Sequence, residues 1–313
     1  MEDYPPQDNI AMPYRIEGLD AQGRVVRLGH ELDTILTRHD YPEPVAKLLG
    51  EALVLTTMLG SALKFDGRFV LQTQSDGPVP MLICDVQTSG DMRAYAKIDY
   101  EKLSLYGKNP SQSVLLGKGH IAFTVDQGAD MENYQGVVPL DGDLTQAAHY
   151  YFEQSEQIET RLRLAADLVD LSDGHKVWRG GGILLQKTAR EGGQRFDDNI
   201  DAAENAFQNS CSSDDWLRLT SLLETTEESE LLDADLAGEI LAYRLFNEDG
   251  VRVFETAPLR FSCRCSRARI ENIITTFSDE ELHDMLEDGM IKVVCEFCNE
   301  KFAFDPSDFA TLS

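Results

Sequence analysis

Cys263-Arg264-Cys265 is followed, after 29 residues, by Cys295-Glu296-Phe297-Cys298. These two close pairs lie in the last 55 residues of a 313-residue chain that has six cysteines in all. Four thiolates supplied by two such pairs are a typical ligand set for a tetrahedral zinc ion. The spacing therefore predicts that Cys263, Cys265, Cys295 and Cys298 bind one zinc per chain. The metal would stabilise a unit that has few large apolar residues of its own.

The residues between and after the two pairs predict a compact unit around the metal. Ser278 and Glu281 have the spacing of a capping box, which opens a helix that we expect to end at Gly289. Residues 290–294 and 301–304 are strand-like, and Cys295-x-x-Cys298 lies in the turn that joins them. This unit is expected to span residues 259–313.

The cysteine spacing alone leaves three interpretations of the zinc centre open. The zinc can be purely structural, in which case the activity lies elsewhere in the chain. Adjacent thiolates can also be oxidised to a disulfide within each pair, with loss of the metal, so the spacing permits a redox switch. A thiol-disulfide oxidoreductase that uses Cys295 and Cys298 is the third interpretation. It would require the pair to open a helix in a thioredoxin-like fold, whereas here the pair follows a strand.

Composition limits the classes of partner. The chain has 28 Lys and Arg against 55 Asp and Glu, a formal net charge of −27. Such a chain repels phosphate backbones and anionic lipids, so neither nucleic acid nor a membrane is expected as a partner. The longest apolar stretch, residues 45–63, contains Lys47 and Glu51 and predicts a buried helix rather than a membrane span. The first residues are neither basic nor apolar, so we expect a cytoplasmic protein with reduced thiols.

Upstream of the zinc unit the pattern predicts an α+β fold. A hairpin is expected between Met12 and Leu28, turning around Gln22-Gly23, and a long helix is expected after Pro44. Further strand-like and helical segments follow without a regular βαβ rhythm, which favours a mixed-sheet domain with packed helices. We assign residues 1–192 to this N-terminal domain. The strand-like and helical segments are residues 68–74, 81–87, 92–96, 120–125 and 144–154.

An acidic segment, residues 193–258, separates the two domains. From Asp197 to Asp235 there are twelve acidic residues and one basic residue, Arg218. Helices are expected near residues 214–223 and 236–246, but they have little apolar area to offset the entropy of ordering. The segment is therefore either a solvated linker or a marginally stable helical layer. Our hypothesis is that it lies across an apolar face of the N-terminal domain.

The two remaining cysteines predict no second site. Cys84 lies in the apolar stretch Met81-Leu82-Ile83-Cys84 and is expected to be a buried packing residue. Cys211 lies in the polar stretch Asn209-Ser210-Cys211-Ser212, and we expect it to be exposed and without a partner.

Several separated motifs, in order along nearly the whole chain, resemble one known family. The cysteine pairs and the other motifs are similar to those of the redox-regulated 33 kDa heat-shock chaperonin, the HslO family. Two minor departures are the lack of a glycine after Arg93 and a longer N-terminal extension. The motifs, besides the cysteine pairs, are Phe65-Asp66-Gly67-Arg68, Asp76-Gly77-Pro78, Tyr134-Gln135-Gly136-Val137-Val138-Pro139-Leu140, Tyr151-Phe152-Glu153-Gln154-Ser155-Glu156-Gln157-Ile158-Glu159-Thr160, Gly181-Gly182-Ile183-Leu184-Leu185-Gln186 and Arg244-Leu245-Phe246.

The resemblance implies a stress-response chaperone and not an enzyme. In that family the reduced, zinc-bound protein is inactive. Oxidation forms one disulfide within each pair, here Cys263–Cys265 and Cys295–Cys298, releases zinc and unfolds the zinc domain with the adjacent linker. The exposed surface then holds unfolding client proteins without ATP, often as a homodimer.

The linker itself offers apolar side chains for client binding. Its first expected helix presents them in a strongly acidic setting, which can hold a misfolding chain while resisting self-aggregation. The alternative remains a protein with a purely structural zinc module and an unidentified activity in the N-terminal domain. The residues expected to bind clients are Trp216, Leu217, Leu219, Leu222 and Leu223.

Overall fold

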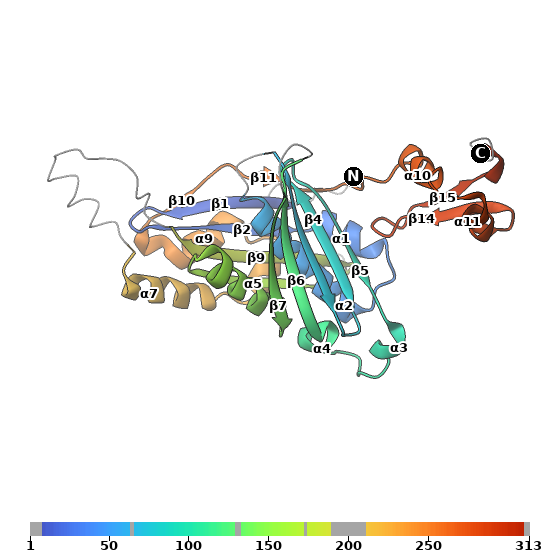
Figure 1. Ribbon diagram of the computed structural model, residues 1–313. Coiled ribbons are helices and arrows are strands. Elements are labelled where there is room, and N and C mark those ends of the chain that lie inside the picture. Colours follow the sequence, from blue (N-terminus) through green and yellow to red (C-terminus); the bar gives the residue numbers. More distant parts are fainter. Residues whose placement is uncertain (1–7, 63–65, 129–132, 172–173, 189–210, 310–313) are drawn as a thin grey trace.

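The computed structural model describes residues 8–62, 66–128, 133–171, 174–188 and 211–309 (Figure 1). Its first sheet has six antiparallel strands, with β1 pairing β2, β10 and β11. Because β10 and β11 come from the far end of the acidic segment, the chain returns to the N-terminal sheet after its helices. In spatial order the strands are β10 (Val251–Val253), β1 (Ile10–Ile16), β2 (Ala21–Leu28), β9 (Lys176–Lys187) and β8 (Thr160–Asp170), with β11 (Ala257–Pro258) also on β1.

The second sheet also has six strands, and it is mixed. β12 runs parallel to β5, whereas the other neighbours are antiparallel. The α+β prediction with mixed sheets is therefore confirmed. In spatial order the strands are β12 (Arg260–Phe261), β5 (Asp91–Lys97), β4 (Met81–Gln87), β3 (Arg68–Ser75), β6 (Lys118–Asp126) and β7 (Tyr134–Asp141).

Helix α2 (Glu43–Gly60) packs against both sheets, and its side chains form the centre of the main apolar cluster. It is buried from residue 48 to residue 60, as the apolar stretch predicted. In the described part of the chain, no helix combines the length and the apolar character that a membrane crossing requires. The other helices of this domain are α1 (His30–Thr37), α3 (Tyr100–Leu103), α4 (Gln112–Leu116), α5 (Leu144–Tyr151) and the π-helix η1 (Phe152–Glu156).

Glu51 is a carboxyl group buried on this helix, and it makes stability depend on pH. Burial raises its pKa from 4.5 to about 7, although a hydrogen bond from Gln112 and the charge of Lys47 oppose the shift. A carboxyl whose folded pKa is raised stabilises the fold below its unfolded pKa. That contribution is lost as the pH rises through about 7.

Replacing Glu51 with glutamine should therefore stabilise the domain at high pH. The amide keeps an oxygen for Gln112 and never ionises, so we expect a gain of about 3 kcal/mol at pH ~8. At pH ~5.5 the gain should shrink to about 1 kcal/mol because most of the folded wild type is already protonated. Urea denaturation of both proteins at the two pH values measures the difference. A gain independent of pH would contradict the assignment.

The acidic segment forms a helical layer on the first sheet, on the face opposite α2 (Figure 1). Met12, Tyr14, Ile183 and Leu185 of the sheet pack against this layer, and the ring of Tyr14 stacks on that of Phe246 with 5.8 Å between centroids. Within the described residues, the hypothesis of a segment lying across an apolar face is confirmed. The expected boundary at residue 192 lies outside them. The layer comprises α7 (Ser213–Glu224), α8 (Glu228–Leu232), α9 (Gly238–Phe246) and η2 (Asn247–Asp249).

The structure corrects the expectation for Cys211. Its side chain is only 7% exposed and belongs to the cluster between the helical layer and the sheet. Cys211 comes immediately before Ser212, whose capping box starts α7, so the polar stretch is the entry to a docked helix and not an open loop. Cys84 is buried in the main core, as expected.

The last unit is small and has its own apolar cluster of six buried residues. The capping box of Ser278 and Glu281 is present and opens α11. The helix ends at Asp284, however, and Gly289 does not end it. Asp288 and Gly289, with φ of 53° and 78°, form the tight turn between β13 and β14. The elements are α10 (Arg267–Ile274), α11 (Asp279–Asp284), β13 (Leu286–Glu287), β14 (Met290–Val294), β15 (Lys301–Phe304) and η3 (Pro306–Asp308).

Candidate metal centre

The four cysteines of the two pairs converge on one point. Their sulfur atoms all lie within 4.8 Å of one another, with 3.7 Å between Cys263 and Cys295 and 3.3 Å between Cys265 and Cys298. A tetrahedron of sulfurs around a zinc ion with bonds of about 2.3 Å has edges of about 3.8 Å. The arrangement therefore fits a tetrahedral thiolate site for a divalent metal.

A tight turn presents the second cysteine pair. Cys295 follows β14, and its N–H donates to the carbonyl of Glu300 at 2.9 Å. Asn299 then takes a left-handed conformation, with φ of 57°, and its N–H donates to the carbonyl of Cys295 at 2.8 Å. The turn places Cys295 and Cys298 on the same side. The first pair reaches them from the extended segment between β12 and α10.

The environment makes one of the four thiols acidic. Burial raises the pKa of the Cys263 thiol. Hydrogen bonds from the backbone of Cys265 and from the neighbouring sulfurs outweigh this effect and bring the pKa to about 7. Burial raises the pKa of Cys265 and of Cys298. A thiolate forms readily at Cys263 near neutral pH, which suits both metal binding and oxidation.

The metal turn rests on the N-terminal domain. The ring of Phe297, between the two cysteines, lies 3.8 Å beneath the guanidinium of Arg93 on β5. Arg38, just after α1, donates to the carbonyl of Cys298 at 3.4 Å, and its own carbonyl accepts a hydrogen bond from the amide of Asn299 at 2.9 Å. The only sequence signal for this docking is an aromatic residue placed between two metal ligands.

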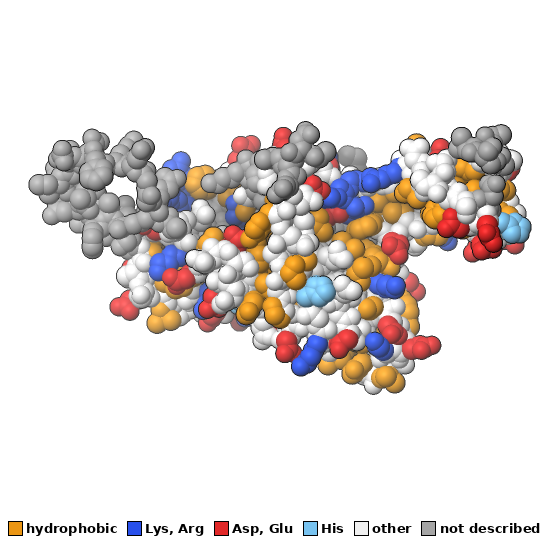
Figure 2. Space-filling view, viewed as in Figure 1, with side chains coloured by type: hydrophobic (Ala, Val, Ile, Leu, Met, Phe, Trp, Pro, Cys, Tyr) orange, Lys and Arg blue, Asp and Glu red, His pale blue; other side chains and the backbone are white. Residues whose placement is uncertain are grey.

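A group of basic side chains lies where the C-terminal unit meets the rest of the chain (Figure 2). Arg264, between the first two cysteines, and Arg93 both pair with the nearly buried Asp85, at 2.7 and 2.8 Å. Partial burial lowers the pKa of Arg264; the charge of Asp85 opposes this shift, and the charges of Arg93 and Arg68 add to it. The carboxylate of Asp85, on β4, therefore links both the cysteine segment and β5 to that strand.

Phe297 offers a way to weaken the docking without changing a sulfur. A cation–π contact contributes about 0.5–1 kcal/mol at a partly exposed site. In Phe297→Ala we therefore expect peroxide to release the metal about two to five times faster, because the turn opens more often. Phe277→Ala is the matched control, since Phe277 is an exposed aromatic residue of the same unit. Equal rates of metal release in the two variants, followed with a chromogenic chelator, would contradict a role for the docking.

The residues expected to bind clients do not form an open surface. Trp216, Leu219 and Leu223 face the first sheet and are buried, and Leu222 is half-buried. Leu217 points away and is 66% exposed. In this state the helical layer uses its apolar side chains to cover the sheet.

Comparisons with known proteins agree along nearly the whole chain. The model of the Hsp33 protein family matches residues 10–305. The 33 kDa chaperonin of Caulobacter vibrioides is 45% identical over 304 residues, which are 96% of this chain and 95% of the relative. The 33 kDa chaperonin of Pseudomonas fluorescens is 34% identical over 310 residues, 98% of this chain and 94% of the relative.

A solved structure shares the fold. It is the crystal structure of the 33 kDa chaperonin (heat shock protein 33 homolog) of Thermotoga maritima, with a TM-score of 0.75 and 20% sequence identity. The match covers 96% of this chain and 97% of that chain. The arrangement of sheets, helical layer and cysteine unit is therefore that of a known fold.

Proposed function

Because the chain belongs to the Hsp33 family, whose members are chaperones and not enzymes, we propose that it is an ATP-independent holdase that oxidation activates. In the reduced state Cys263, Cys265, Cys295 and Cys298 bind one zinc ion and the protein is inactive. Oxidation releases the zinc and unfolds first the zinc unit and then the helical layer. The uncovered surface binds unfolding client proteins and prevents their aggregation.

The observation that carries this proposal is the continuity between the helical layer and the metal centre. The layer covers an apolar face of the first sheet, and Cys263 follows the last residue of β12 by two positions. Between them the chain is held by the short edge strands β10, β11 and β12. Loss of the zinc unit therefore removes the anchor at one end of the layer.

The energies favour unfolding when the metal leaves. A structural zinc site contributes about 10–16 kcal/mol to the folding of a small domain. The zinc unit has only six buried residues in its apolar cluster, too few to maintain the fold without the metal. Domain stability is commonly about 5–15 kcal/mol, so the loss of zinc is large on that scale.

The disulfides are proposed to form within each pair, as Cys263–Cys265 and Cys295–Cys298. In the metal centre two sulfur distances of 3.7 Å and 3.3 Å cross between the pairs, from Cys263 to Cys295 and from Cys265 to Cys298. A disulfide across the pairs would hold the segment of Cys263 and Cys265 covalently to the turn of Cys295 and Cys298. Disulfides within the pairs let the two parts separate. The resemblance to the Hsp33 family implies pairing within each pair, and that pairing is compatible with the proposed unfolding.

The function test combines three readouts on the full chain. The protein is treated with peroxide at mild heat and assayed for zinc release, for disulfides by peptide mapping, and for suppression of aggregation of a thermally unfolding client. We expect about one zinc released per chain, disulfides within each pair, and holdase activity that thiol reverses. Zinc that leaves without any activity appearing would favour the alternative, a purely structural metal and an unidentified activity in the N-terminal domain.

Partners and location follow from the same proposal. Its partners are unfolding client proteins, and the oxidised chain is proposed to act as a homodimer. A cytoplasmic location is proposed because a thiol switch needs a compartment that keeps its cysteines reduced until stress. Sedimentation of the reduced and oxidised protein tests dimerisation, since a mass unchanged by oxidation would remove that part of the proposal.

A further inference from the structure

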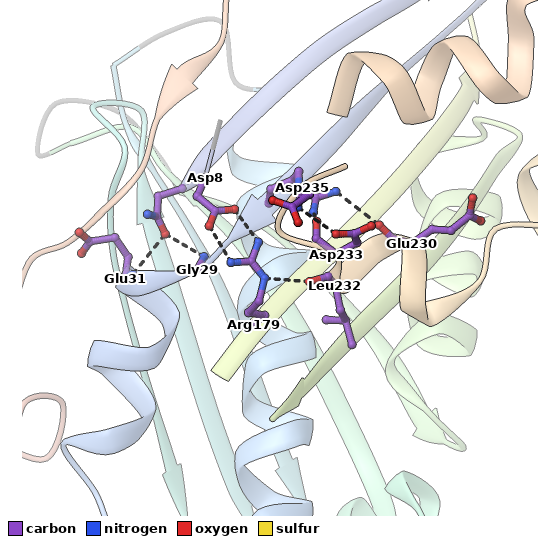
Figure 3. Close-up of polar contacts among 10 residues, drawn as sticks. Asp8, Gly29, Glu31, Arg179, Glu230, Leu232, Asp233 and Asp235 are labelled. Atoms are coloured by element: carbon purple, nitrogen blue, oxygen red, sulfur yellow. Dashed lines mark hydrogen bonds and ion pairs between the residues drawn. The ribbon is translucent and has the colours of Figure 1, made fainter. Parts of the chain in front are cut away.

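Two arginines buried beneath the helical layer bind its main chain, and Figure 3 labels one of them, Arg179, beside Leu232 and Asp8. Arg27 lies on β2 and Arg179 on β9, and each is only 2% exposed. Arg179 donates from Nε to the carbonyl of Leu232 at 2.8 Å. Arg27 donates to the carbonyls of Glu230, at 3.5 Å, and of Asp233. Three main-chain oxygens at the end of α8 therefore face two guanidinium groups.

The positive charges of Arg27 and Arg179 face carbonyl oxygens, which carry partial negative charge. The last carbonyls of a helix have no partner within the helix and lie at the negative end of its dipole. Arg179 is already paired with Asp8 through two contacts of 2.7 Å. Arg27 makes no ion pair with a carboxylate among residues 8–62, 66–128, 133–171, 174–188 and 211–309, so carbonyls are its acceptors. Departure of the layer would leave charged donors without those acceptors.

A glycine next to the arginines lets a main chain approach closely. A β-carbon at Gly181 on β9 would overlap the carbonyl of Leu231. Leu231 and Leu232 are both buried against the sheet, so the same segment fills apolar space beside its hydrogen bonds. We call Arg27, Arg179 and Gly181 together the arginine site.

We propose that the arginine site is a binding site for polypeptide main chain, which the helical layer occupies in the reduced protein and a client segment occupies after oxidation. The segment that fills it, Glu230-Leu231-Leu232-Asp233, indicates the preferred chemistry: free carbonyls of a turn, paired leucines and acidic neighbours. This inference rests on the proposed function and names part of the client surface. The positive charge of the arginine site would also attract acidic client segments to a chain whose net charge is −27.

The test uses a labelled peptide and the full chain. The probe is a fluorescein-labelled synthetic peptide with the sequence of residues 227–238, and its binding is followed by fluorescence anisotropy. We expect oxidised wild type to bind it saturably. We expect reduced, zinc-bound protein to bind it at least ten times more weakly, because its site is filled.

Variants of the arginine site separate client binding from simple attachment of the layer. Oxidised Arg27→Met should bind the peptide at least five times more weakly than wild type. Arg24→Met is the matched control: Arg24 lies on the same strand but on the face towards α2, beside Met58, and binding should stay within twofold. Gly181→Ala changes no charge and should also weaken binding at least fivefold, which keeps the test valid if Arg27→Met folds poorly.

The opposite result has a clear meaning. If Arg27 only fastened the layer, Arg27→Met would weaken the internal competitor, and the peptide would bind equally well or more tightly. That result, or no peptide binding by oxidised wild type, would overturn the inference. Client aggregation is measured on the same wild-type samples. Failure to suppress it would reject the proposed function itself, whereas suppression without the peptide effects would reject the arginine site alone.

Discussion

Cys298→Ser is expected to abolish zinc binding and to leave the C-terminal unit unfolded under reducing conditions. Cys298 is the most buried of the four cysteines, and its sulfur lies 3.3 Å from that of Cys265. A serine hydroxyl is not ionised at neutral pH and does not replace a thiolate on zinc. The loss approaches the full contribution of the metal, about 10 kcal/mol or more.

Zinc content and hydrogen exchange measure this effect together. We expect less than one tenth of a zinc per chain and rapid exchange throughout residues 267–304. Cys211→Ser is the matched control, because Cys211 is also buried but lies in the helical layer, away from the metal centre. Near-stoichiometric zinc in Cys298→Ser, or slow exchange without zinc, would show that the unit does not depend on this ligand.

Asp8→Ala is expected to produce the largest loss of stability in the N-terminal domain. Asp8 and Arg179 form a bidentate pair in which both side chains are 2% exposed. Removal of one partner of a buried pair costs about 3–5 kcal/mol because the other charge stays buried without compensation. For a domain of this size we expect the melting temperature to fall by about 10 °C.

Two further variants show whether the uncompensated charge is the cause. Glu17→Ala removes an exposed partner of Arg252, at 3.9 Å, and should change stability by less than about 1 kcal/mol. The double change Asp8→Leu with Arg179→Met replaces the pair by apolar side chains and should recover the part of the loss that comes from the unpaired charge, although it also removes the hydrogen bond from Arg179 to the carbonyl of Leu232. Scanning calorimetry of the reduced, zinc-loaded proteins gives the comparison. A double variant as unstable as Asp8→Ala would point to packing and not to charge.

Local sequence patterns were sufficient for the elements that local interactions stabilise. The apolar helix over residues 43–60, the capping box of Ser278 and Glu281, and the convergence of two cysteine pairs were all predicted. Each depends on residues close in the sequence or on a ligand set with a known geometry. These features define the fold class and the candidate metal centre.

Predictions were wrong where a residue's surroundings come from distant parts of the chain. Gln22-Gly23 was expected to turn the first hairpin, but residues 17–20 make the turn and Gly23 lies within β2. A β-carbon there would overlap the ring of Tyr14. Cys211 has polar neighbours in sequence yet packs on a sheet whose strands come from both ends of the domain. A glycine does not by itself reveal whether it forms a turn or packs within a strand. A polar stretch does not by itself reveal whether it is exposed or docked on a sheet.

The docking of the helical layer was expected, but its polar contacts were not. Arg27 interrupts the apolar run Val25-Val26-Arg27-Leu28, and Arg179 precedes three glycines. An arginine on the inner face of a strand is a signal for a buried partner, since an unpaired buried charge is costly. Apart from Asp8, which pairs with Arg179, the partners are main-chain carbonyls, and these carry no sequence signature.

Three short edge strands follow the helical layer, and in the proposed activation they would set the order of its release. β12 has two residues, β11 two and β10 three, and they lie in this order between the cysteine end and the helices. Unfolding that starts at the cysteine end would detach β12 first, then β11 and then β10. It would not have to break all their hydrogen bonds at once. On the same proposal, refolding after reduction would start from the helices, so a partly refolded chain would have its helices docked before its cysteines bind the metal.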